Sequence, residues 1–410
     1  IINSLDWLGL QFDEEIIYQS NRSEQYNKHL KLLLKSGSAY RCFASKEELE
    51  EIRKETNSYQ YNGLWREKSD VEINEQIELG RPYTIRLKTP NNGSIILKDM
   101  IYGDIKIQNN EIDDFIIMRS DGNPVYNFTN TIDDHDMNIS HVIRGEDHIS
   151  NTPKQMYLYA ALDWEIPKFA HLPMILGEDK KRLSKRHGAN SIETYRDDGY
   201  LPEALINYLA LLGWNPGTDE EIMDLSQIVS KFDLGRVQKK SAVFDPRKLS
   251  WVSSQYLIKK DPSKILESIR TIDPLWGKDK EDSFCITVVK LMKSRSNSLT
   301  EIIEGSSYFF TAPKIFNPKD LKKVWKDKTG QIISEIFELY TSSDIWEKEH
   351  IENVFKNYIE YSGYSFGQVM RPMRIAICGS LTGPSLFELM ELLGSEETNS
   401  RLNFLIKENK

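Results

Sequence analysis

The sequence predicts an α/β protein that continues into an all-helical carboxyl-terminal region. Short β-rich runs near Phe115 and His141 are followed by a charged loop and by a helix expected to begin near Pro153, because proline suits the first helical turn. Beyond Trp251 the apolar spacing is helical almost throughout. A basic segment, 180–188, lies between these two parts. Together these observations predict a ligand site beyond the carboxyl ends of the strands, followed by a helical unit.

The composition is that of a soluble globular protein. The 410 residues are 39% hydrophobic and 28% charged, which allows about two to four domains with real cores. No apolar run approaches the length of a membrane span, so we expect no membrane segment. The 3 cysteines are far apart in the sequence, which argues against a disulfide framework and favours the reducing cytoplasm.

A nucleic-acid partner would have to contact local basic surfaces, because the formal net charge is −9. One candidate is the stretch 235–260, which is rich in lysine and arginine and contains Phe244, Trp251 and Tyr256. Such a mixture of cations and aromatic rings suits contact with an RNA backbone. The alternative is an ordinary solvated face of a helix and a loop.

The first part of the chain predicts helices and then an inserted α+β unit. From residue 1 to about 36 the apolar spacing is helical, with a break near Gly9. Residues 46–56 predict an exposed helix, and alternating apolar residues predict strands over 83–87 and 101–107.

The middle of the chain predicts a hairpin, a strand and a helix. Residues 115–118 and 124–128 flank an Asp-Gly turn, which is a strong hairpin signal. A strand over 141–144 runs directly into charged residues, and 201–213 predict a compact helix.

Residues 180–188 form a strongly basic run, Lys-Lys-Arg-Leu-Ser-Lys-Arg-His-Gly. Cations beside a small hydroxyl residue and a glycine make a loop that suits phosphate oxygens. On composition alone, a solvated charge run or a nuclear-import-like patch is the more ordinary explanation. The motifs around the run favour the phosphate-binding loop.

A series of motifs resembles the bacterial glutamyl-tRNA synthetases, a family of class I aminoacyl-tRNA synthetases. The run 182–186 resembles the second signature of class I, in the variant common to this family. Further blocks match the family in the expected order: 124–135, 141–148, 200–205, 211–214, 244–249, 370–374 and 383–384. A short basic motif is weak by itself, but the ordered series covers essentially the whole chain.

The resemblance implies a Rossmann-like catalytic domain that is truncated at its amino terminus, carries an α+β insertion and is followed by an all-α anticodon-binding region. The implied segments are the remainder of the first catalytic half (1–38), the acceptor-stem-binding insertion (39–112), the second catalytic half (113–170), a stem-contact region with the KMSKS-like loop (171–251) and two helical anticodon-binding subdomains (252–325 and 326–410).

The same resemblance implies a glutamate–tRNA ligase. Such an enzyme activates L-glutamate with ATP and Mg²⁺ and transfers it to the 3′ end of tRNA-Glu. Adenylate formation needs positive charge where pyrophosphate builds up, so Lys185 is the candidate catalytic residue, assisted by Arg182 and Ser184. Asp147 and His148 match positions that line the ATP site of the family.

Glutamate carries two carboxylates and one ammonium group, so its pocket needs a fork of donors. Arg144 can bind one carboxylate through two parallel hydrogen bonds. Tyr126 and Asn130 are four residues apart, can add neutral hydrogen bonds and match pocket positions of the family. From the residues alone, a buried core tyrosine and a capping asparagine are the ordinary alternatives.

Two aspartates and three histidines raise the alternative of a metal site: Asp133, Asp134, His135, His141 and His148. Their spacing follows no ligand pattern, so we expect no metal there. We expect instead that one of the aspartates caps a helix.

Other functions are weighed against the ligase. One is a non-catalytic tRNA-binding paralogue, and another is a non-discriminating synthetase that also charges tRNA-Gln. The shorter relatives that glutamylate a modified base lack the helical carboxyl-terminal region. Glutaminyl-tRNA synthetases use a β-barrel there, whereas 265–293 and 386–393 predict helices. We expect a cytoplasmic monomer.

The first class I signature, a His-Ile-Gly-His-type element, is absent, as are the early arginine and acidic residues that the family uses for glutamate. We therefore expect that a segment with half of the ATP site precedes Ile1 in the intact protein. We also expect the chain as given to form glutamyl-adenylate poorly.

Many bacterial relatives hold a structural zinc ion in the inserted domain through a Cys-x-Cys pair and downstream residues. Here Cys42 is kept, but Ala44 stands two residues on, and Trp65 occupies a position where a cysteine is expected. One thiol cannot form a tetrahedral zinc site, so we predict no structural zinc. Elemental analysis of the purified protein should find only traces, and a stoichiometric amount of zinc would contradict the prediction.

Overall fold

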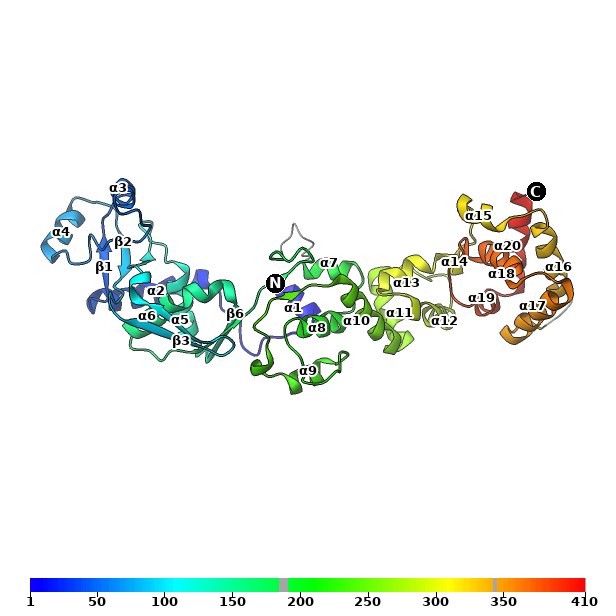
Figure 1. The fold of residues 1–410 in the computed structure, drawn as a ribbon, viewed down its shortest axis with the longest axis horizontal. Helices are drawn as coiled ribbons and strands as arrows, with labels where there is room; N and C mark the ends of the chain where they lie inside the picture. Colours follow the sequence, from blue (N-terminus) through cyan, green and yellow to red (C-terminus); the bar gives the residue numbers. More distant parts are fainter. Residues whose placement is uncertain (184–190, 342–344, 410) are drawn as a thin grey trace.

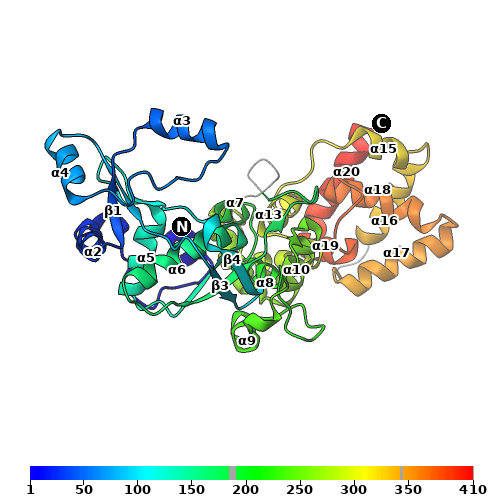
Figure 2. The same cartoon turned by 60° about the vertical axis from the view of Figure 1, so that its left-hand side comes forward.

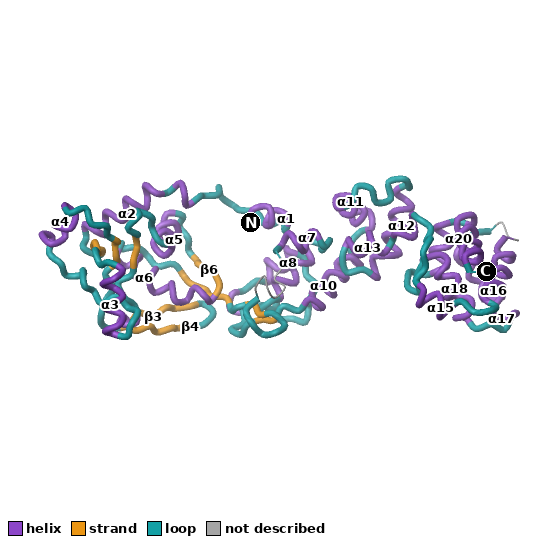
Figure 3. The backbone as a smooth tube through the Cα atoms, turned by 90° about the horizontal axis from the view of Figure 1, so that it is seen from above, coloured by secondary structure: helices purple, strands orange, loops and turns teal. Residues whose placement is uncertain are grey.

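The structure, a computed structural model, describes residues 1–183, 191–341 and 345–409. The chain is elongated: strands with their covering helices form one end, the last helices form the other, and helices α7 to α10 lie between them (Figure 1). Figure 3 shows the same order from above, with the labelled strands remote from the C-terminus. Within the described ranges, no helix is both long enough and apolar enough to cross a membrane.

The β-containing end is built on an antiparallel sheet of order β1-β2-β5 and a mixed sheet of order β4-β3-β7-β6. The strands are β1 (Ala39–Cys42), β2 (Thr84–Leu87), β3 (Ser94–Asp99), β4 (Gly103–Gln108), β5 (Ile116–Met118), β6 (His141–Gly145) and β7 (Lys168–Leu172). β7 pairs in parallel with β3 and with β6, so that Asp99 lies opposite Phe169 and Arg144 opposite His171. Strands from the segment 39–112 therefore share a sheet with strands that follow it.

Three helices cover the antiparallel sheet: α2 (Ser23–Lys35), α5 (Tyr126–Asp136) and α6 (Thr152–Ala161). Their apolar faces meet the strands in one cluster, in which Leu33, Phe128 and Leu158 pack with Leu87 and Ile117 and all are fully buried. Burial of each such side chain stabilises the fold by about 1.5–3 kcal/mol. This packing fixes α5 and α6, the two helices that flank the candidate site.

The predicted hairpin over 115–128 is only half correct. Its first arm is β5, and Gly122 adopts the positive φ that the Asp-Gly turn requires. The second arm is wrong as a strand, because the chain makes one bridge at Pro124 and then starts α5 at Tyr126. Phe128, Thr131 and Ile132 explain the difference: the last two follow Phe128 by three and four residues and all are buried, which fits one face of a helix and not the alternation of a strand.

The predicted helical stretch over 1–36 is also interrupted. It consists of α1 (Ile2–Trp7), a 3₁₀ turn (Gln19–Asn21) and α2, and the residues between α1 and the turn are not helical. α1 lies beside α7 and α8 in the middle of the molecule (Figure 1), where Ser4 hydrogen-bonds Glu193 and Leu8 joins the core around Leu201.

In the residues that the structure describes, the middle region combines a short parallel β-pair with four α-helices. These elements are β8 (Ile175–Leu176), β9 (Ala242–Val243), α7 (Ile192–Asp197), α8 (Pro202–Leu211), α9 (Leu225–Lys231) and α10 (Pro246–Lys259). The predicted helix over 201–213 is confirmed as α8. Helix α10 runs continuously through residue 251, where the sequence places a segment boundary, and that boundary stays a prediction.

The helices beyond α10 confirm the all-α prediction for the carboxyl-terminal region (Figure 2). They are α11 (Pro262–Ile272), α12 (Asp282–Met292), α13 (Leu299–Gly305), α14 (Ser307–Phe310), α15 (Pro318–Val324), α16 (Thr329–Thr341), α17 (Lys348–Ser362), α18 (Phe366–Cys378), α19 (Leu386–Leu393) and α20 (Ser395–Glu408). Local sequence starts two of them, α11 and α15, in the same way as α10, because Asp261, Asn317 and Asp245 each cap a helix whose first residue is proline.

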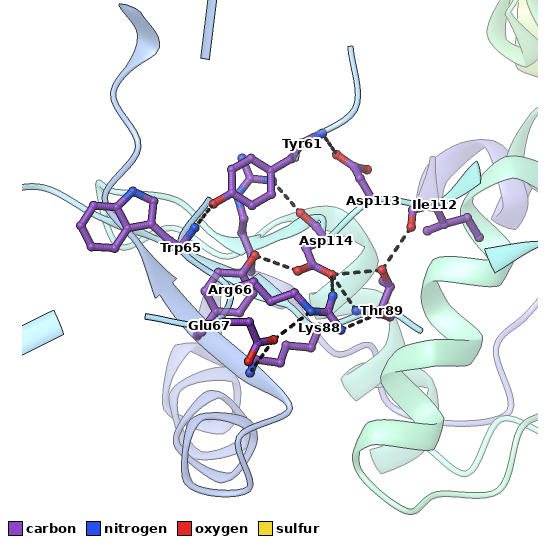
Figure 4. A network of polar contacts seen from close by, with 11 residues as sticks. Tyr61, Trp65, Arg66, Glu67, Lys88, Thr89, Ile112, Asp113 and Asp114 are labelled. Atoms are coloured by element: carbon purple, nitrogen blue, oxygen red, sulfur yellow. Dashed lines mark hydrogen bonds and ion pairs between the residues drawn. The ribbon is translucent and has the colours of Figure 1, made fainter. Parts of the chain in front are cut away.

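A buried polar network ties the segment after α3 (Lys46–Thr56) to the antiparallel sheet (Figure 4). The carboxylate of Asp114, only 4% exposed, accepts hydrogen bonds from Arg66, from Tyr40 and from both the amide and the hydroxyl of Thr89. The Arg66 guanidinium also donates to the Thr89 carbonyl at 2.9 Å. A carboxylate with this many donors is fully satisfied, so the loop is held without any covalent link.

The same subregion contains the residues considered for zinc. The Cys42 thiol donates to the Tyr61 hydroxyl at 3.4 Å, and the Trp65 amide donates to the same oxygen at 2.7 Å. The Trp65 ring packs against Phe43 at 5.1 Å between centroids. Among the described residues, no group of three or more His, Cys, Asp or Glu side chains could hold a metal ion. The absence of zinc stays a prediction.

Candidate functional site

Arg144 lies in β6 with its guanidinium held on two sides by protein groups. Its Nε donates to Nε2 of His171 at 3.2 Å, and its Nη2 donates to Thr152 Oγ1 at 2.7 Å and to Gln155 Oε1 at 2.8 Å. The acceptors come from β7 and α6, so the mixed sheet and its covering helix together fix the orientation of the fork.

The third nitrogen of the Arg144 guanidinium, Nη1, takes part in none of these hydrogen bonds. Nη1 of Arg144 is buried and has no hydrogen-bond partner among the described residues, and the same is true of the Tyr159 hydroxyl. Burial lowers the pKa of Arg144, while Tyr126, Asp134 and Tyr159 act in the opposite direction. A buried cationic donor without a partner is costly, which is what a site for an anionic ligand would show.

Tyr126 and Asn130 lie on the first turns of α5, beside this guanidinium. Tyr126 is 47% exposed, and its ring lies 5.7 Å from the ring of His148 between centroids. Asn130 donates through Nδ2 to Asp134 Oδ2 at 2.7 Å. The structure thus brings three predicted pocket residues, Tyr126, Asn130 and Arg144, into one neighbourhood.

Asp134 completes this neighbourhood, although the sequence predicted only a capping role for it or for Asp133. Desolvation raises the pKa of the Asp134 carboxyl to about 6, against the effects of the Asn130 hydrogen bond and the Arg144 charge. Both aspartates lie within α5 rather than at its start, so the capping prediction is wrong.

Asp133 instead ties α5 to residues 19–26, at the start of α2 and just before it. Its carboxylate accepts from Arg22 Nε at 2.6 Å, from the Tyr26 hydroxyl at 2.9 Å and from Gln19 Nε2 at 2.8 Å. Burial and this contact raise the pKa of Tyr26 to about 12. Arg22, Tyr26 and Gln19 carried no sequence signal for this role.

The start of the basic segment lies next to the end of β6. Arg182 donates through Nη2 to Asp147 Oδ2 at 3.0 Å, and the Leu183 amide donates to the Ile175 carbonyl at 2.9 Å. Asp147 belongs to the 3₁₀ turn Glu146–Asn151, which also carries His148. The two remaining predicted residues of the segment, Ser184 and Lys185, lie outside the described residues.

A second contact joins the β3–β4 turn to the segment before β8. The Tyr102 hydroxyl donates to one carboxylate oxygen of Glu146, and the Met174 amide donates to the other at 2.9 Å. Sequence reasoning placed Glu146 beyond the strand but missed Tyr102, which lies 44 residues earlier.

The basic stretch over 235–260 is partly neutralised. Lys248 pairs with Glu221 at 2.5 Å and lies over the Trp251 ring at 4.1 Å, and Lys260 pairs with Glu203 at 2.5 Å. Arg247 lies 3.6 Å from Asp245 but keeps 89% of its side chain exposed. The stretch therefore keeps an exposed cationic group on α10, beside partly exposed ion pairs.

Family models match both parts of the chain. The catalytic domain of class I tRNA synthetases (E and Q) matches residues 1–251, and an anticodon-binding domain matches residues 263–406.

Curated relatives match over nearly the whole chain. Glutamate–tRNA ligase 2 of Thermoanaerobacter pseudethanolicus is 40% identical over 98% of this chain and 86% of its own length. Glutamate–tRNA ligase of Geotalea uraniireducens is 42% identical, with the same coverage. A crystal structure of a glutamate tRNA ligase from Elizabethkingia meningosepticum, in complex with its amino acid, superposes with a TM-score of 0.89 at 34% identity, over 100% of this chain and 88% of that one.

The raised pKa of Asp134 predicts a pH-dependent stability. Because the folded chain holds this proton up to about pH 6, above the ordinary carboxyl value of 3.8, it binds more protons than the unfolded chain between these limits. Stability from this group is then fully present at low pH and is lost as pH rises through about 6. Asp134→Asn should therefore gain stability relative to wild type as pH rises from about 4.5 to 7.

The measurement is thermal melting of both proteins across this range. Asp104→Asn, which removes an exposed carboxylate from β4, is the control and should show no such trend. A constant difference between Asp134→Asn and wild type would contradict the raised pKa.

Proposed function

The chain belongs to the class I glutamyl-tRNA synthetases, and we propose that the residues around Arg144 form its glutamate pocket. The protein is a glutamate–tRNA ligase, an aminoacyl-tRNA synthetase that joins glutamate to tRNA with ATP as substrate. The non-catalytic paralogue is not favoured, because the relatives that match along the chain are named as ligases.

One observation supports the pocket above the others: the buried and unpartnered Nη1 of Arg144. A substrate carboxylate placed there would satisfy this donor and complete the set of acceptors around the guanidinium. Tyr126, which lies close enough to the Arg144 guanidinium to influence its pKa, would add a neutral hydrogen bond from its hydroxyl. Asn130 and Asp134, joined by their hydrogen bond, would line the same side of the pocket.

Adenylate formation would then take place between this pocket and the basic segment. A carboxylate oxygen of glutamate attacks the α-phosphorus of ATP, and pyrophosphate leaves. Charge builds up on the leaving phosphates, where we place Lys185 as the catalytic cation with Arg182 and Ser184 beside it. The Arg182–Asp147 contact supports this placement, because it holds the start of the segment at the end of β6. Mg²⁺ would arrive on the ATP phosphates and neutralise part of their charge.

Transfer to tRNA completes the reaction. A ribose hydroxyl at the 3′ end of tRNA-Glu attacks the carbonyl carbon of the adenylate, and AMP leaves. We propose that Asp147 and His148 border the nucleotide, since both lie in the turn after β6 near Arg182 and Tyr126. We further propose that 39–112 contact the acceptor stem, that 252–325 and 326–410 bind the anticodon and that the protein acts as a cytoplasmic monomer. Charging assays with purified tRNA-Glu and tRNA-Gln decide whether the second tRNA is also a substrate.

Replacement of Lys185 by alanine in the intact protein, which is also the background for every kinetic variant below, tests the phosphate-binding role. We expect adenylate formation to fall by on the order of 100-fold, because a cation that stabilises the leaving pyrophosphate is lost, while tRNA binding stays nearly unchanged. Lys181→Ala is the matched control, since Lys181 is an exposed cation of the same segment. Equal losses in the two variants would show that the segment acts only as a diffuse charge.

Replacement of Arg144 by lysine tests the pocket. Lysine keeps the positive charge but removes the planar fork, so KM for glutamate in aminoacylation should rise by at least about tenfold with a smaller change in KM for ATP. Arg22→Lys is the control, because Arg22 is another largely buried arginine, with 15% of its side chain exposed, and it pairs with Asp133 outside the proposed pocket. An unchanged KM for glutamate in Arg144→Lys would remove Arg144 from the proposed site.

A further inference from the structure

A second buried carboxylate, that of Asp99, lies behind the proposed pocket. Asp99 ends β3 and is 4% exposed. Its Oδ1 accepts from the amides of Ile101 at 2.9 Å and Tyr102 at 2.8 Å. Its Oδ2 accepts from the amide of His171 at 3.1 Å and contacts His171 Nδ1 at 2.6 Å.

These contacts assign the tautomer of His171. The other partners of the carboxylate are amide donors, so Nδ1 of His171 carries the hydrogen that points at Oδ2. In a neutral ring Nε2 then bears a lone pair. It can therefore accept the hydrogen bond that Nε of Arg144 donates over 3.2 Å. Burial lowers the pKa of His171 and favours the neutral ring, with Arg144 and His148 acting in the same direction and Asp99 opposing them.

We propose that Asp99 and His171 are positioning residues for glutamate binding, and this proposal rests on the pocket assigned above. Asp99 fixes the His171 tautomer, and His171 accepts from Nε of Arg144. With Thr152 and Gln155 holding Nη2, only Nη1 is presented to the substrate. Asp99 and His171 make no contact with substrate themselves.

The hydrogen-bonded series from Asp99 through His171 to Arg144 also connects segments that are far apart in the sequence. Asp99 lies in β3, within the segment 39–112, whereas His171 and Arg144 lie in β7 and β6. Because the strands are adjacent in the mixed sheet, the segment expected to contact the tRNA acceptor stem also sets the geometry of the amino-acid pocket.

Asp99→Asn is the direct test. Asparagine has one acceptor oxygen and one donor NH₂ group where the carboxylate has two acceptor oxygens. Its oxygen can accept from the amides of Ile101 and Tyr102 only if its NH₂ group faces His171. The ring hydrogen then moves to Nε2, where it opposes the Arg144 Nε–H. We expect KM for glutamate to rise by about tenfold, as for other residues that orient a binding group, with kcat and the KM values for ATP and tRNA changed by less than about twofold.

Asp114→Asn is the matched control. Asp114 is also a 4% exposed carboxylate that accepts several hydrogen bonds, but its donors belong to Tyr40, Arg66 and Thr89, in the network of Figure 4, and not to Arg144 or His171. It should lower thermal stability without changing KM for glutamate selectively. A folded Asp99→Asn protein with unchanged KM for glutamate, or with the same effects as Asp114→Asn, would overturn the proposal.

A double-mutant cycle separates positioning from general damage. The amide oxygen of His171→Gln can accept from Arg144 Nε whatever residue 99 is, so Asp99→Asn should raise KM for glutamate far less in the His171→Gln background. If the effects of Asp99→Asn and His171→Gln on KM for glutamate were additive, Asp99 would not act through His171 and the proposal would be wrong. If Asp99→Asn does not fold, the pair His171→Gln and His171→Leu decides: only the leucine, which has no acceptor, should raise this KM.

The outcomes also distinguish the two proposals. If Arg144→Lys leaves KM for glutamate unchanged, the pocket itself is wrong. If Arg144→Lys raises that KM and Asp99→Asn does not, the pocket stands and the positioning role of Asp99 and His171 fails.

Discussion

The orientation of the Arg144 guanidinium is the constraint on which the catalytic part of the molecule depends. A planar cation with five donors cannot be buried unless nearly all of them meet acceptors. The protein supplies these acceptors from two elements, β7 and α6, and leaves one nitrogen for a ligand. The register of β6 against β7 therefore also determines the orientation of the guanidinium, because it places Arg144 opposite His171.

The segment 39–112 takes part in this arrangement rather than standing apart from it. Its β3 strand contributes Asp99, and the turn after β3 contributes Tyr102, which reaches Glu146 beyond the end of β6. Glu146 in turn receives the amide of Met174, just before the strand that leads to the basic segment. A few hydrogen bonds thus connect the proposed acceptor-stem region, the amino-acid pocket and the base of the phosphate-binding segment.

Local signals in the sequence predicted much of this and missed a definite class of contact. Asp245, Asp261 and Asn317, each followed by proline, mark three helix starts, and Arg144 could be found because it lies near the end of the short apolar run that forms β6. Asp99 and His171 are separated by 72 residues and carry no motif, so only the pairing of β3 with β7 brings them together. The capping prediction for Asp133 was wrong, because its role depends on Arg22, just before α2, and on Tyr26, within α2. The missed contacts are pairings between distant segments, which local spacing does not encode.

Helix α10 shows where this protein can and cannot be divided. The family models for its two parts end at residue 251 and begin at residue 263, yet α10 is unbroken from Pro246 to Lys259 and buries Leu257 within the gap between the two matches. The same apolar core runs from Tyr195 through α10 into the last helices. A fragment that stops at the end of the first match would cut α10 in the middle and expose apolar side chains that the rest of the helix covers. The catalytic and helical parts are therefore matched by separate family models but share one core when folded.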